Sequence, residues 1–507
     1  LHYDAVFNKK HHVTGLLGYE YYQRDNNYFR AENSGFGTDA THENNLGGGN
    51  APKMSSSKDR RKDISGFGRV DYSFDDKYLA TVTLRRDGSS VFGGNNKYAY
   101  FPGVSVGWKI DKEDFMAGAA DKVDILKLRL GYGQSGNSGI DPYQSLSKYD
   151  MTTNGILGQN KVSGATLTNY MENPDLKWET TSQVNLGIDY GFFSRLSGNL
   201  DFFVKNTKDM LVQVSQSPMT GHKYQWQNAA SMRVWGLEYS LNSTNIQTRD
   251  FEWDTQLSFS WTDNKITDYN VTDESTVAAL NTIGVIKGER TNSYYTYVID
   301  GIDPSSGSYR FKDLDGDGSI TVKDKAILGT PDPRVILGFG NTFKYKNFAL
   351  DIFFNANFGN KMYNYSAMNF TLPNTFETSN YMVDAMNYWS ESNPNSDIAA
   401  NRANGNGNAL YNSRWIEDAW FIRLQNVTLS YNLASIPSLR KIFPTAKIYV
   451  QAQNLFLITP YSGLDPELAN NAYMSSSENL PAFLPGSVDM NAYPPARTFT
   501  VGLNFSF

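Results

Sequence analysis

Hydrophobic residues alternate with polar ones in segments that recur from one end of this 507-residue chain to the other. In the final segment, TFTVGLNFSF, one face carries Phe499, Val501, Leu503, Phe505 and Phe507, and the other carries small and polar residues. Because successive side chains of a strand point to opposite faces, a period of two predicts strands with one apolar face. The segments KYLATVTLRRDG, ILKLRLGYG, QVNLGIDYG and NVTLSYNL repeat the pattern. We therefore expect an all-β chain with about 14 strands, most of them about ten residues long or longer.

The connections between these segments are of two kinds. Short ones are SFDDKY, GFFSR, NIQTRD and KYKNF. Long strands with short turns at one edge and long loops at the other are typical of outer-membrane barrels, whereas soluble sandwiches have shorter strands. We therefore predict a transmembrane antiparallel β-barrel over residues 1–507, with the short turns in the periplasm and the long loops outside the cell. The long connections, rich in Asn, Gly and Ser, are residues 23–63, 135–180, 207–232, 264–333, 359–413 and 457–496.

Composition agrees with a barrel and excludes several other classes. The mean hydropathy is −0.48, and no apolar run approaches the roughly 18 residues of a membrane helix. A barrel strand is apolar only at alternate positions, which keeps the mean hydropathy low. The net charge of −6 gives no basic bias toward nucleic acid. Cys is absent, which excludes disulfides and thiol chemistry, and the five His residues have no partners at zinc spacing.

Two short motifs resemble catalytic or cofactor-binding ones but lie in segments that read as strands. GYGQSG matches GxGxxG with Gly131, Gly133 and Gly136, yet the helix that a dinucleotide site needs does not follow. GVSVG matches GxSxG around Ser105, but the alternation continues through it where a nucleophile would need a sharp strand-to-helix turn. We interpret both as ordinary strand residues and predict no catalytic site and no enzyme activity.

The most specific motif is the acidic loop FKDLDGDGSITVKDKAILG, which begins at residue 311. Three carboxylates within five residues repel one another unless a divalent cation neutralises them. Ca²⁺ prefers oxygen ligands at such spacing, with a glycine at the sharp turn. Set against the twelve-residue calcium loop, residues 313–324 supply as candidate ligands Asp313, Asp315, Asp317, Ser319 through its backbone carbonyl, and Asp324.

We predict that a structural Ca²⁺, with Mg²⁺ as the alternative, binds these residues. The last position is Asp324 rather than Glu, and the sequence before the loop does not read as a helix, so a structural ion fits better than an EF-hand switch. Such an ion would offset part of the entropy lost when the long connection 264–333 becomes ordered. The alternative is an Asp/Gly turn that only resembles a calcium loop.

Several segments resemble one family, the SusC/RagA-type TonB-dependent outer-membrane transporters of Bacteroidetes. They include GRVDYSFDDKYLATVTLRRDGSSVFGG, NPDLKWETTSQVNLGIDYGFF, DAWFIRLQNVTLSYNL and IYVQAQNLFLITPYSGLDPE, and the resemblance extends over nearly the whole chain. It implies a barrel of about 22 strands with an N-terminal plug inside. The plug, the TonB box and about eight early strands are not in this sequence. We therefore interpret the chain as the C-terminal part of a longer protein, with Leu1 as the edge of a fragment.

The resemblance also implies a function. Family members import oligosaccharides or oligopeptides into the periplasm, and they pair with a SusD-like surface lipoprotein that acts as a lid. TonB, ExbB and ExbD supply the energy, and relatives are commonly dimers of transporter–lipoprotein pairs embedded in outer-membrane lipid. The alternatives are a non-transporting barrel that acts as an adhesin or assembly scaffold, and a soluble β-rich carbohydrate-binding enzyme with a dockerin-like calcium loop.

No substrate-binding residue can be assigned from this sequence. Aromatic residues of the long connections, such as Tyr224, Trp226, Tyr363 and Tyr365, would suit sugar rings or peptide backbones. For each of them, packing within the loops or an aromatic girdle at the membrane interface is the simpler interpretation.

Overall fold

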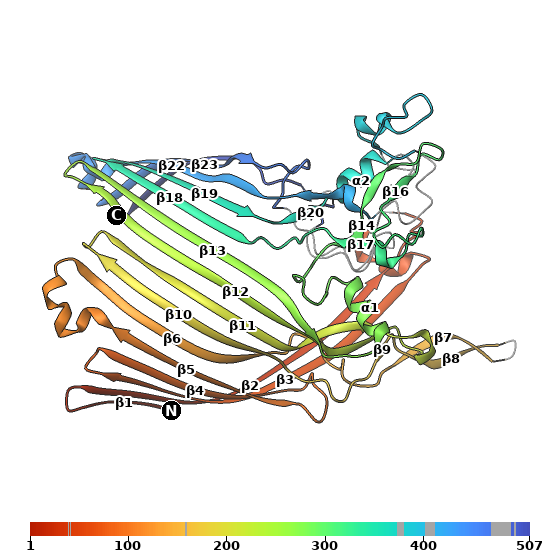
Figure 1. Cartoon of the computed structure of the whole chain (residues 1–507), viewed down its shortest axis with the longest axis horizontal. Helices are drawn as coiled ribbons and strands as arrows, with labels where there is room; N and C mark the ends of the chain where they lie inside the picture. Colours follow the sequence, from red (N-terminus) through yellow and green to blue (C-terminus); the bar gives the residue numbers. More distant parts are fainter. Residues whose placement is uncertain are drawn as a thin grey trace. The chain divides into compact units, whose positions relative to one another are not determined.

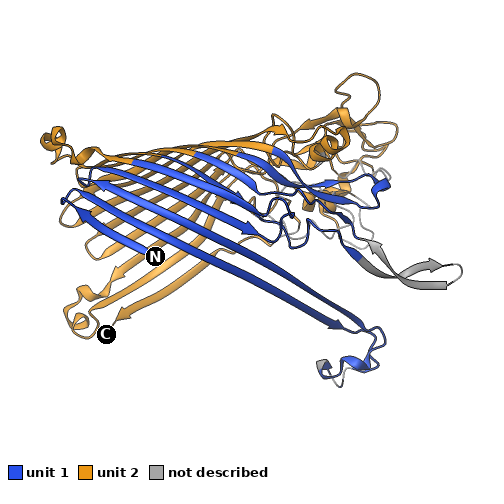
Figure 2. Cartoon of the chain, turned by 90° about the horizontal axis from the view of Figure 1, so that it is seen from below, with its two compact units in different colours: residues 1–106, 131–183, 207–230 blue, residues 107–130, 184–206, 231–507 orange. Residues whose placement is uncertain are grey.

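Two compact units make up the computed structural model of the chain (Figure 2). Unit 1 comprises residues 1–106, 131–183 and 207–230, and unit 2 comprises residues 107–130, 184–206 and 231–507. Phe507, which the sequence places on the apolar face of the last strand, lies outside the described residues. The structure describes residues 1–38, 40, 42–157, 160–372, 380–400, 411–467, 488–490 and 493–506.

One 16-stranded sheet contains the long strands (Figure 1), in the order β1-β2-β3-β4-β5-β6-β10-β11-β12-β13-β18-β19-β22-β23-β24. The short strand β9 (Tyr170–Met171) pairs with β12 in parallel. The prediction of an all-β chain in which consecutive long strands are neighbours is confirmed. The strands are β1 (His2–Phe7), β2 (His11–Glu32), β3 (Lys53–Phe74), β4 (Tyr78–Ser89), β5 (Tyr98–Lys109), β6 (Val123–Asn137), β10 (Glu179–Phe192), β11 (Leu196–Ser215), β12 (Tyr224–Gln247), β13 (Phe251–Tyr269), β18 (Val335–Tyr345), β19 (Phe348–Phe358), β22 (Phe421–Asn432), β23 (Thr445–Ile458) and β24 (Thr498–Ser506).

Shorter elements lie in the connections. Within the described residues, none of the helices combines the length and the hydrophobicity needed to cross a membrane. The short strands are β7 (Tyr149–Leu157), β8 (Asn160–Leu167), β14 (Tyr295–Tyr297), β15 (Ile299–Ile302), β16 (Tyr309–Phe311), β17 (Lys325–Ile327), β20 (Lys361–Tyr363) and β21 (Ile416–Asp418). The helices are α1 (Glu274–Thr282), α2 (Tyr365–Thr371) and α3 (Pro437–Arg440), and the 3₁₀ turns are η1 (His42–Asn44), η2 (Leu46–Gly48), η3 (Ile110–Lys112), η4 (Asp114–Ala119), η5 (Pro218–Thr220), η6 (Val322–Asp324), η7 (Val383–Asn387), η10 (Ser413–Trp415) and η11 (Leu433–Ser435).

Short and long connections alternate along the chain as predicted, but two of the long ones are shorter than expected. Strand β2 continues to Glu32 and strand β3 begins at Lys53, so both extend into the stretch predicted as a connection over 23–63. Strands β11 and β12 likewise shorten the connection predicted over 207–232. Backbone pairing continues in these regions after the apolar alternation has stopped. The side-chain pattern therefore underestimates strand length where both faces are polar.

In unit 1, the register separates an apolar face from a polar face. Val70 of β3 lies beside Val82 of β4, and both are exposed. On the opposite face, Asp71 lies between Thr14 and Thr81. The Thr14 and Thr81 hydroxyls donate hydrogen bonds to the Asp71 carboxylate at 3.2 and 2.7 Å. One face of these strands is thus suited to hydrocarbon and the other to water.

The same separation extends across six strands of unit 2, from β13 to β24. The apolar face exposes large side chains such as Val450 and Val501. A polar row lies next to the apolar row, one residue away on each strand. Within it, the Thr342 hydroxyl donates to the Asp351 carboxylate at 2.7 Å. The apolar row is Trp253, Phe343, Leu350, Leu429, Val450 and Val501, and the polar row is Asp254, Thr342, Asp351, Thr428, Gln451 and Thr500.

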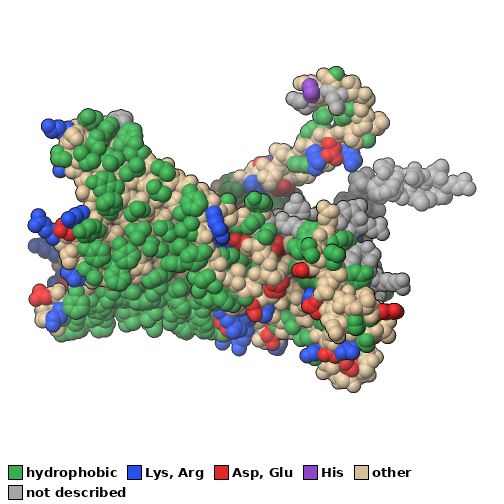
Figure 3. All heavy atoms as spheres, turned by 90° about the horizontal axis from the view of Figure 1, so that it is seen from above, with side chains coloured by type: hydrophobic (Ala, Val, Ile, Leu, Met, Phe, Trp, Pro, Cys, Tyr) green, Lys and Arg blue, Asp and Glu red, His purple; other side chains and the backbone are tan. Residues whose placement is uncertain are grey.

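Aromatic side chains mark the edge of the apolar face next to the short turns. Phe251, Tyr345, Phe348 and Tyr431 lie side by side in adjacent strands of unit 2. The Phe348 and Tyr431 rings are 4.7 Å apart. Figure 3 shows hydrophobic side chains gathered over the strands, with charged side chains gathered at the margins. Apolar bands with aromatic borders are typical of barrel strands that cross a bilayer.

The motifs GYGQSG and GVSVG lie in strands, as interpreted. Gly131, Gly133 and Gly136 belong to β6, and Ser105 belongs to β5. The arrangement that a dinucleotide site requires, a strand followed directly by a helix, is not formed at GYGQSG in the described residues.

Candidate functional site

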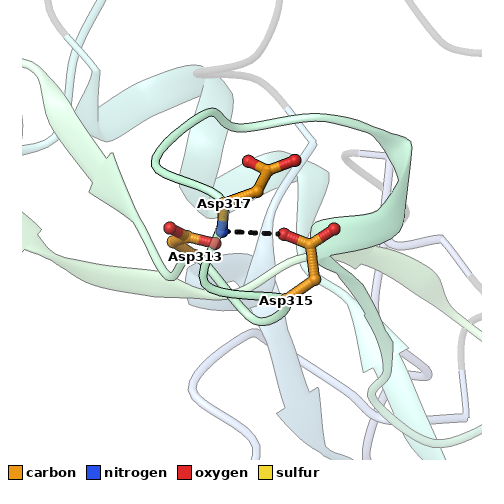
Figure 4. A group of neighbouring side chains, drawn as sticks. All are labelled: Asp313, Asp315 and Asp317. Atoms are coloured by element: carbon orange, nitrogen blue, oxygen red, sulfur yellow. Dashed lines mark hydrogen bonds between the residues drawn. The ribbon is translucent and has the colours of Figure 1, made fainter.

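The acidic loop joins β16 to β17 in unit 2, and it gathers three carboxylates. Asp313, Asp315 and Asp317 each present an oxygen atom within 4.8 Å of those of the other two (Figure 4). All three side chains are exposed. Oxygen ligands that each lie about 2.4 Å from a calcium ion are themselves up to about 5 Å apart. The spacing of these carboxylates therefore fits a divalent cation.

Backbone hydrogen bonds hold the loop in this shape. The amides of Gly316 and Gly318 donate to the two oxygens of Asp313, at 2.7 and 2.8 Å. Both glycines have positive φ, +75° and +82°, a conformation that other residues rarely adopt. The Ser319 amide donates to the Asp317 carboxylate at 2.8 Å. The glycines thus allow the chain to turn tightly enough to bring the carboxylates together.

Asp324 is placed differently from the three gathered carboxylates. Its side chain is buried, and it accepts hydrogen bonds from the backbone amides of Thr321 and Leu314, both at 2.7 Å. These hydrogen bonds lower the pKa of Asp324, because backbone amides favour the charged carboxylate. Of the five residues proposed as ligands, the structure brings Asp313, Asp315 and Asp317 together, and Asp324 closes the loop through its backbone contacts.

The long connections of unit 2 share one hydrophobic core. Residues from the connections 270–334, 359–420 and 459–497 all contribute to it. Tyr363 and Tyr365, which the sequence left open between substrate contact and packing, are buried in this core and serve for packing. The core consists of Tyr294, Tyr309, Tyr363, Tyr365, Met368, Leu372, Ile398, Ala399, Tyr411, Trp415 and Val488.

The other two aromatic candidates, Tyr224 and Trp226, pack within unit 1. Trp226 packs against a core that contains Phe92 and Trp178, and the Tyr224 ring lies 5.9 Å from that of Tyr170. The Trp226 carbonyl accepts a hydrogen bond from the Asn173 side chain at 2.8 Å. These contacts favour the interpretation of Tyr224 and Trp226 as packing residues.

Polar contacts tie the three connections of unit 2 to one another. The Thr296 hydroxyl donates to the Tyr411 carbonyl at 2.9 Å. Asp489 accepts from the Ser366 hydroxyl at 2.8 Å and from the Tyr461 hydroxyl at 2.7 Å. The described parts of these connections therefore form a folded layer with its own core, and the acidic loop is part of it.

A buried ion pair anchors the connection 459–497 to the sheet. The Arg423 guanidinium of β22 donates to both oxygens of Asp465, at 2.7 and 2.8 Å, and it lies 3.2 Å from Glu467. The side chains of Arg423 and Asp465 are each only 4% exposed. Sequence reasoning missed this pair. The signal was a charged residue in the apolar stretch WFIRLQ, a position where an arginine requires a buried partner.

A second charged network lies within the strands of unit 2. Arg129 of β6 binds Asp189 of β10 at 2.8 Å and Asp201 of β11 at 2.9 Å. A Cβ atom added at Gly187 would lie 2.3 Å from Oδ1 of Asp201 and 2.6 Å from Cζ of Arg129, so any larger residue would force this ion pair to shift. The polar face of the sheet therefore carries charges that are paired across adjacent strands.

Antiparallel neighbouring strands, an exposed apolar face with aromatic borders, short turns at one edge and folded loops at the other define an outer-membrane β-barrel. Residues 2–455 match the profile described as TonB dependent receptor-like, beta-barrel. The chain belongs to this family and is of the SusC/RagA type. It is accordingly a barrel of the outer membrane. The members of this family are transporters rather than enzymes, so the alternative of a soluble carbohydrate-binding enzyme is wrong.

Similar proteins support this assignment. TonB-dependent receptor P3 of Formosa agariphila is 33% identical over 533 residues, covering 100% of this chain and 52% of the relative. TonB-dependent receptor SusC of Bacteroides thetaiotaomicron is 31% identical over 465 residues, covering 88% of this chain and 44% of the relative. The structure of the RagAB peptide transporter superposes with a TM-score of 0.83 at 26% identity, covering 100% of this chain and 54% of that one. The chain thus spans about half the length of the relatives that it matches.

Proposed function

We propose that this chain forms the membrane wall and the extracellular loop layer of an active importer for oligosaccharides or oligopeptides. The observation that carries the proposal is the match of residues 2–455 to the TonB-dependent receptor barrel. Two features of the described residues support it. The polar rows of the sheet supply a wet wall, and the long connections of unit 2 supply an ordered outer layer. A large polar solute would need the outer layer in order to enter and the polar wall in order to pass through the barrel.

The proposal includes partners. A SusD-like surface lipoprotein would close over the loops, and TonB, ExbB and ExbD would supply energy through regions outside this sequence. The similarity to the RagAB peptide transporter supports an oligopeptide substrate, and the oligosaccharide alternative rests on the family resemblance of the sequence. We also propose the dimer of transporter–lipoprotein pairs that the family resemblance implies.

Uptake by cells tests this function. Cells that carry the complete protein would receive fluorescent oligopeptides or oligosaccharides, with and without a protonophore that collapses the proton gradient. We expect accumulation of one substrate class only when the gradient is intact, and co-purification of a surface lipoprotein. Surface binding that is unaffected by the protonophore and leads to no uptake would support the adhesin or scaffold alternative instead.

We further propose that the acidic loop holds a structural Ca²⁺, with Mg²⁺ as the alternative. Asp313, Asp315 and Asp317 supply hard carboxylate oxygens at a suitable spacing, and the backbone carbonyl of Ser319 and the carboxylate of Asp324 complete the donor set suggested by the sequence. The ion would neutralise the three carboxylates and stiffen the loop. Binding of ⁴⁵Ca²⁺ by the complete protein, lost in Asp313→Asn/Asp317→Asn, tests this assignment, and unchanged binding by that variant would contradict it.

A further inference from the structure

The apolar face of unit 1 ends at a definite level along β3. From the short turn at Phe74 to Ile64, the residues on this face are apolar or glycine. This stretch is about as long as the 9–11 residues with which a tilted strand crosses the hydrocarbon. The residues on this face are Phe74, Tyr72, Val70, Gly68, Gly66 and Ile64.

Exposed tyrosines lie at that level on the same face. Tyr19 and Tyr21 of β2 are opposite Gly66 and Ile64, and they are 71% and 54% exposed. On β5, Tyr98 and Tyr100 are likewise exposed. Tyrosines gather where hydrocarbon meets headgroups, because one end of the side chain is apolar and the other is wet. These four residues therefore mark the outer membrane interface of unit 1.

Basic side chains lie at the level of these tyrosines and just beyond it, on the same face. Arg86 is opposite Gly66 in the register, and its guanidinium lies 4.2 Å from the centre of the Tyr98 ring. Lys62 is two residues beyond Ile64 on β3, and it is exposed. Because residues at even spacing share a face of a strand, Lys62 and Arg86 lie on the face that carries the apolar residues. Long basic side chains at this level extend toward the headgroups.

The pairing of these cations differs from that of the arginines on the opposite face. Arg61, Arg69 and Arg85 each bind an aspartate two residues further on, at 2.6 to 2.7 Å. On the outward face, Arg60 pairs with Asp25. Among the described residues, neither Arg86 nor Lys62 has an ion pair with a carboxylate. A cation at a membrane surface without a protein counter-ion attracts anionic groups of the lipid.

We propose that Arg86 and Lys62 form a binding site for the phosphate groups of an anionic lipid in the outer leaflet. The tyrosines set the depth of the lipid, and the two cations neutralise its phosphates at the outer edge of the hydrocarbon. Asp25 already pairs with Arg60, whereas the charges of Arg86 and Lys62 remain for the lipid. The site lies on the lipid-facing side of the sheet, so it is separate from the proposed transport pathway and does not depend on it.

Native mass spectrometry of the complete protein in neutral detergent, titrated with lipid A, tests the proposal. Near an anionic surface each basic residue contributes about fivefold in affinity. We therefore expect Lys62→Gln/Arg86→Gln to bind lipid A about 30-fold more weakly. The charge-preserving variant Lys62→Arg/Arg86→Lys should bind nearly as well as the unmodified protein. The matched control Lys9→Gln/Lys53→Gln, which removes two exposed cations away from this level, should bind unchanged.

Three results would overturn the proposal. One is equal lipid A affinity in Lys62→Gln/Arg86→Gln and in the unmodified protein. The second is binding of phosphatidylcholine as tight as that of lipid A. The third is saturation by inorganic phosphate at the same concentration, which would make the ligand free phosphate rather than a lipid. The salt dependence of lipid A binding tests the site in the unmodified protein, without any variant. The lipid A affinity should fall as the ionic strength rises. An affinity that does not depend on salt would count against the site even if the variants failed to fold.

Discussion

Breaking the buried ion pair between Arg423 and Asp465 should release the connection 459–497 from the sheet. In Asp465→Asn the guanidinium loses two charge-assisted hydrogen bonds and stays buried, with only the half-exposed Glu467 nearby. Removing one partner of a buried pair costs about 3–5 kcal/mol. Because Glu467 remains, we expect the lower end of that range, which increases local opening by at least about 100-fold.

Hydrogen exchange of the backbone amides between residues 461 and 467 measures this opening directly. The Glu467 amide is the most informative, because it donates to the Asp465 carboxylate at 2.9 Å. The matched control is Asp397→Asn, which breaks the Arg414–Asp397 pair, whose aspartate is 71% exposed. An exposed pair contributes only about 0–1 kcal/mol, so exchange near Asp397 should change less than about fivefold.

The double variant Arg423→Met/Asp465→Leu separates the charge effect from lost packing. Because no unpaired charge remains buried, exchange protection should recover toward that of the unmodified protein. Equal exchange in Asp465→Asn and in the unmodified protein would refute the reasoning, as would a double variant that opens more readily than the single one.

Three other predictions concern the acidic loop and the polar face. Chelation of divalent ions should speed proteolysis within residues 313–324 in the unmodified protein but not in Asp317→Asn; an unchanged cleavage rate would contradict an ion in the loop. The lowered pKa of Asp324 stabilises the loop above the ordinary pKa of 3.8, and this contribution is lost as the pH falls through the lowered folded-state pKa. Loop proteolysis, measured with an acid-stable protease, should therefore rise only below about pH 4, and a rise near pH 6 would argue against it. Gly187→Ala should destabilise the barrel by about 1–3 kcal/mol, because the new methyl group would push Asp201 and Arg129 out of their ion pair. Gly133→Ala, which meets no atom within 4 Å, should leave thermal unfolding unchanged, and equal effects of the two substitutions would contradict this explanation.

The strands could be predicted from the sequence because a bilayer imposes a strict period of two. Val450 and Gln451 fall on opposite faces for that reason alone, and the register places them in the apolar and polar rows. The period of two did not predict the parts of the strands that extend beyond the apolar face. Between residues 23 and 32, β2 continues with polar residues on both faces, so no alternation marks the strand.

The acidic loop was partly visible in the sequence, and the buried ion pair was not. The DxDGDG pattern specifies local turns, and Gly316 and Gly318 form them as their conformational freedom allows. Asp324, by contrast, meets the amides of Leu314 and Thr321 only after the loop has folded back on itself. The partner of Arg423 lies 42 residues away in a long connection, and no local pattern specifies such a contact.

The central claim is that one face of these strands contacts lipid while the other faces water. Single cysteines at neighbouring positions test it most directly, because this chain contains no cysteine of its own. In the complete protein in membranes, cleared of any other thiol, Gln451→Cys should react with a water-soluble maleimide. Val450→Cys should resist that reagent, and a fluorophore attached there in detergent before reconstitution should be quenched by lipid-borne quenchers. Rapid aqueous labelling at both positions would contradict the account.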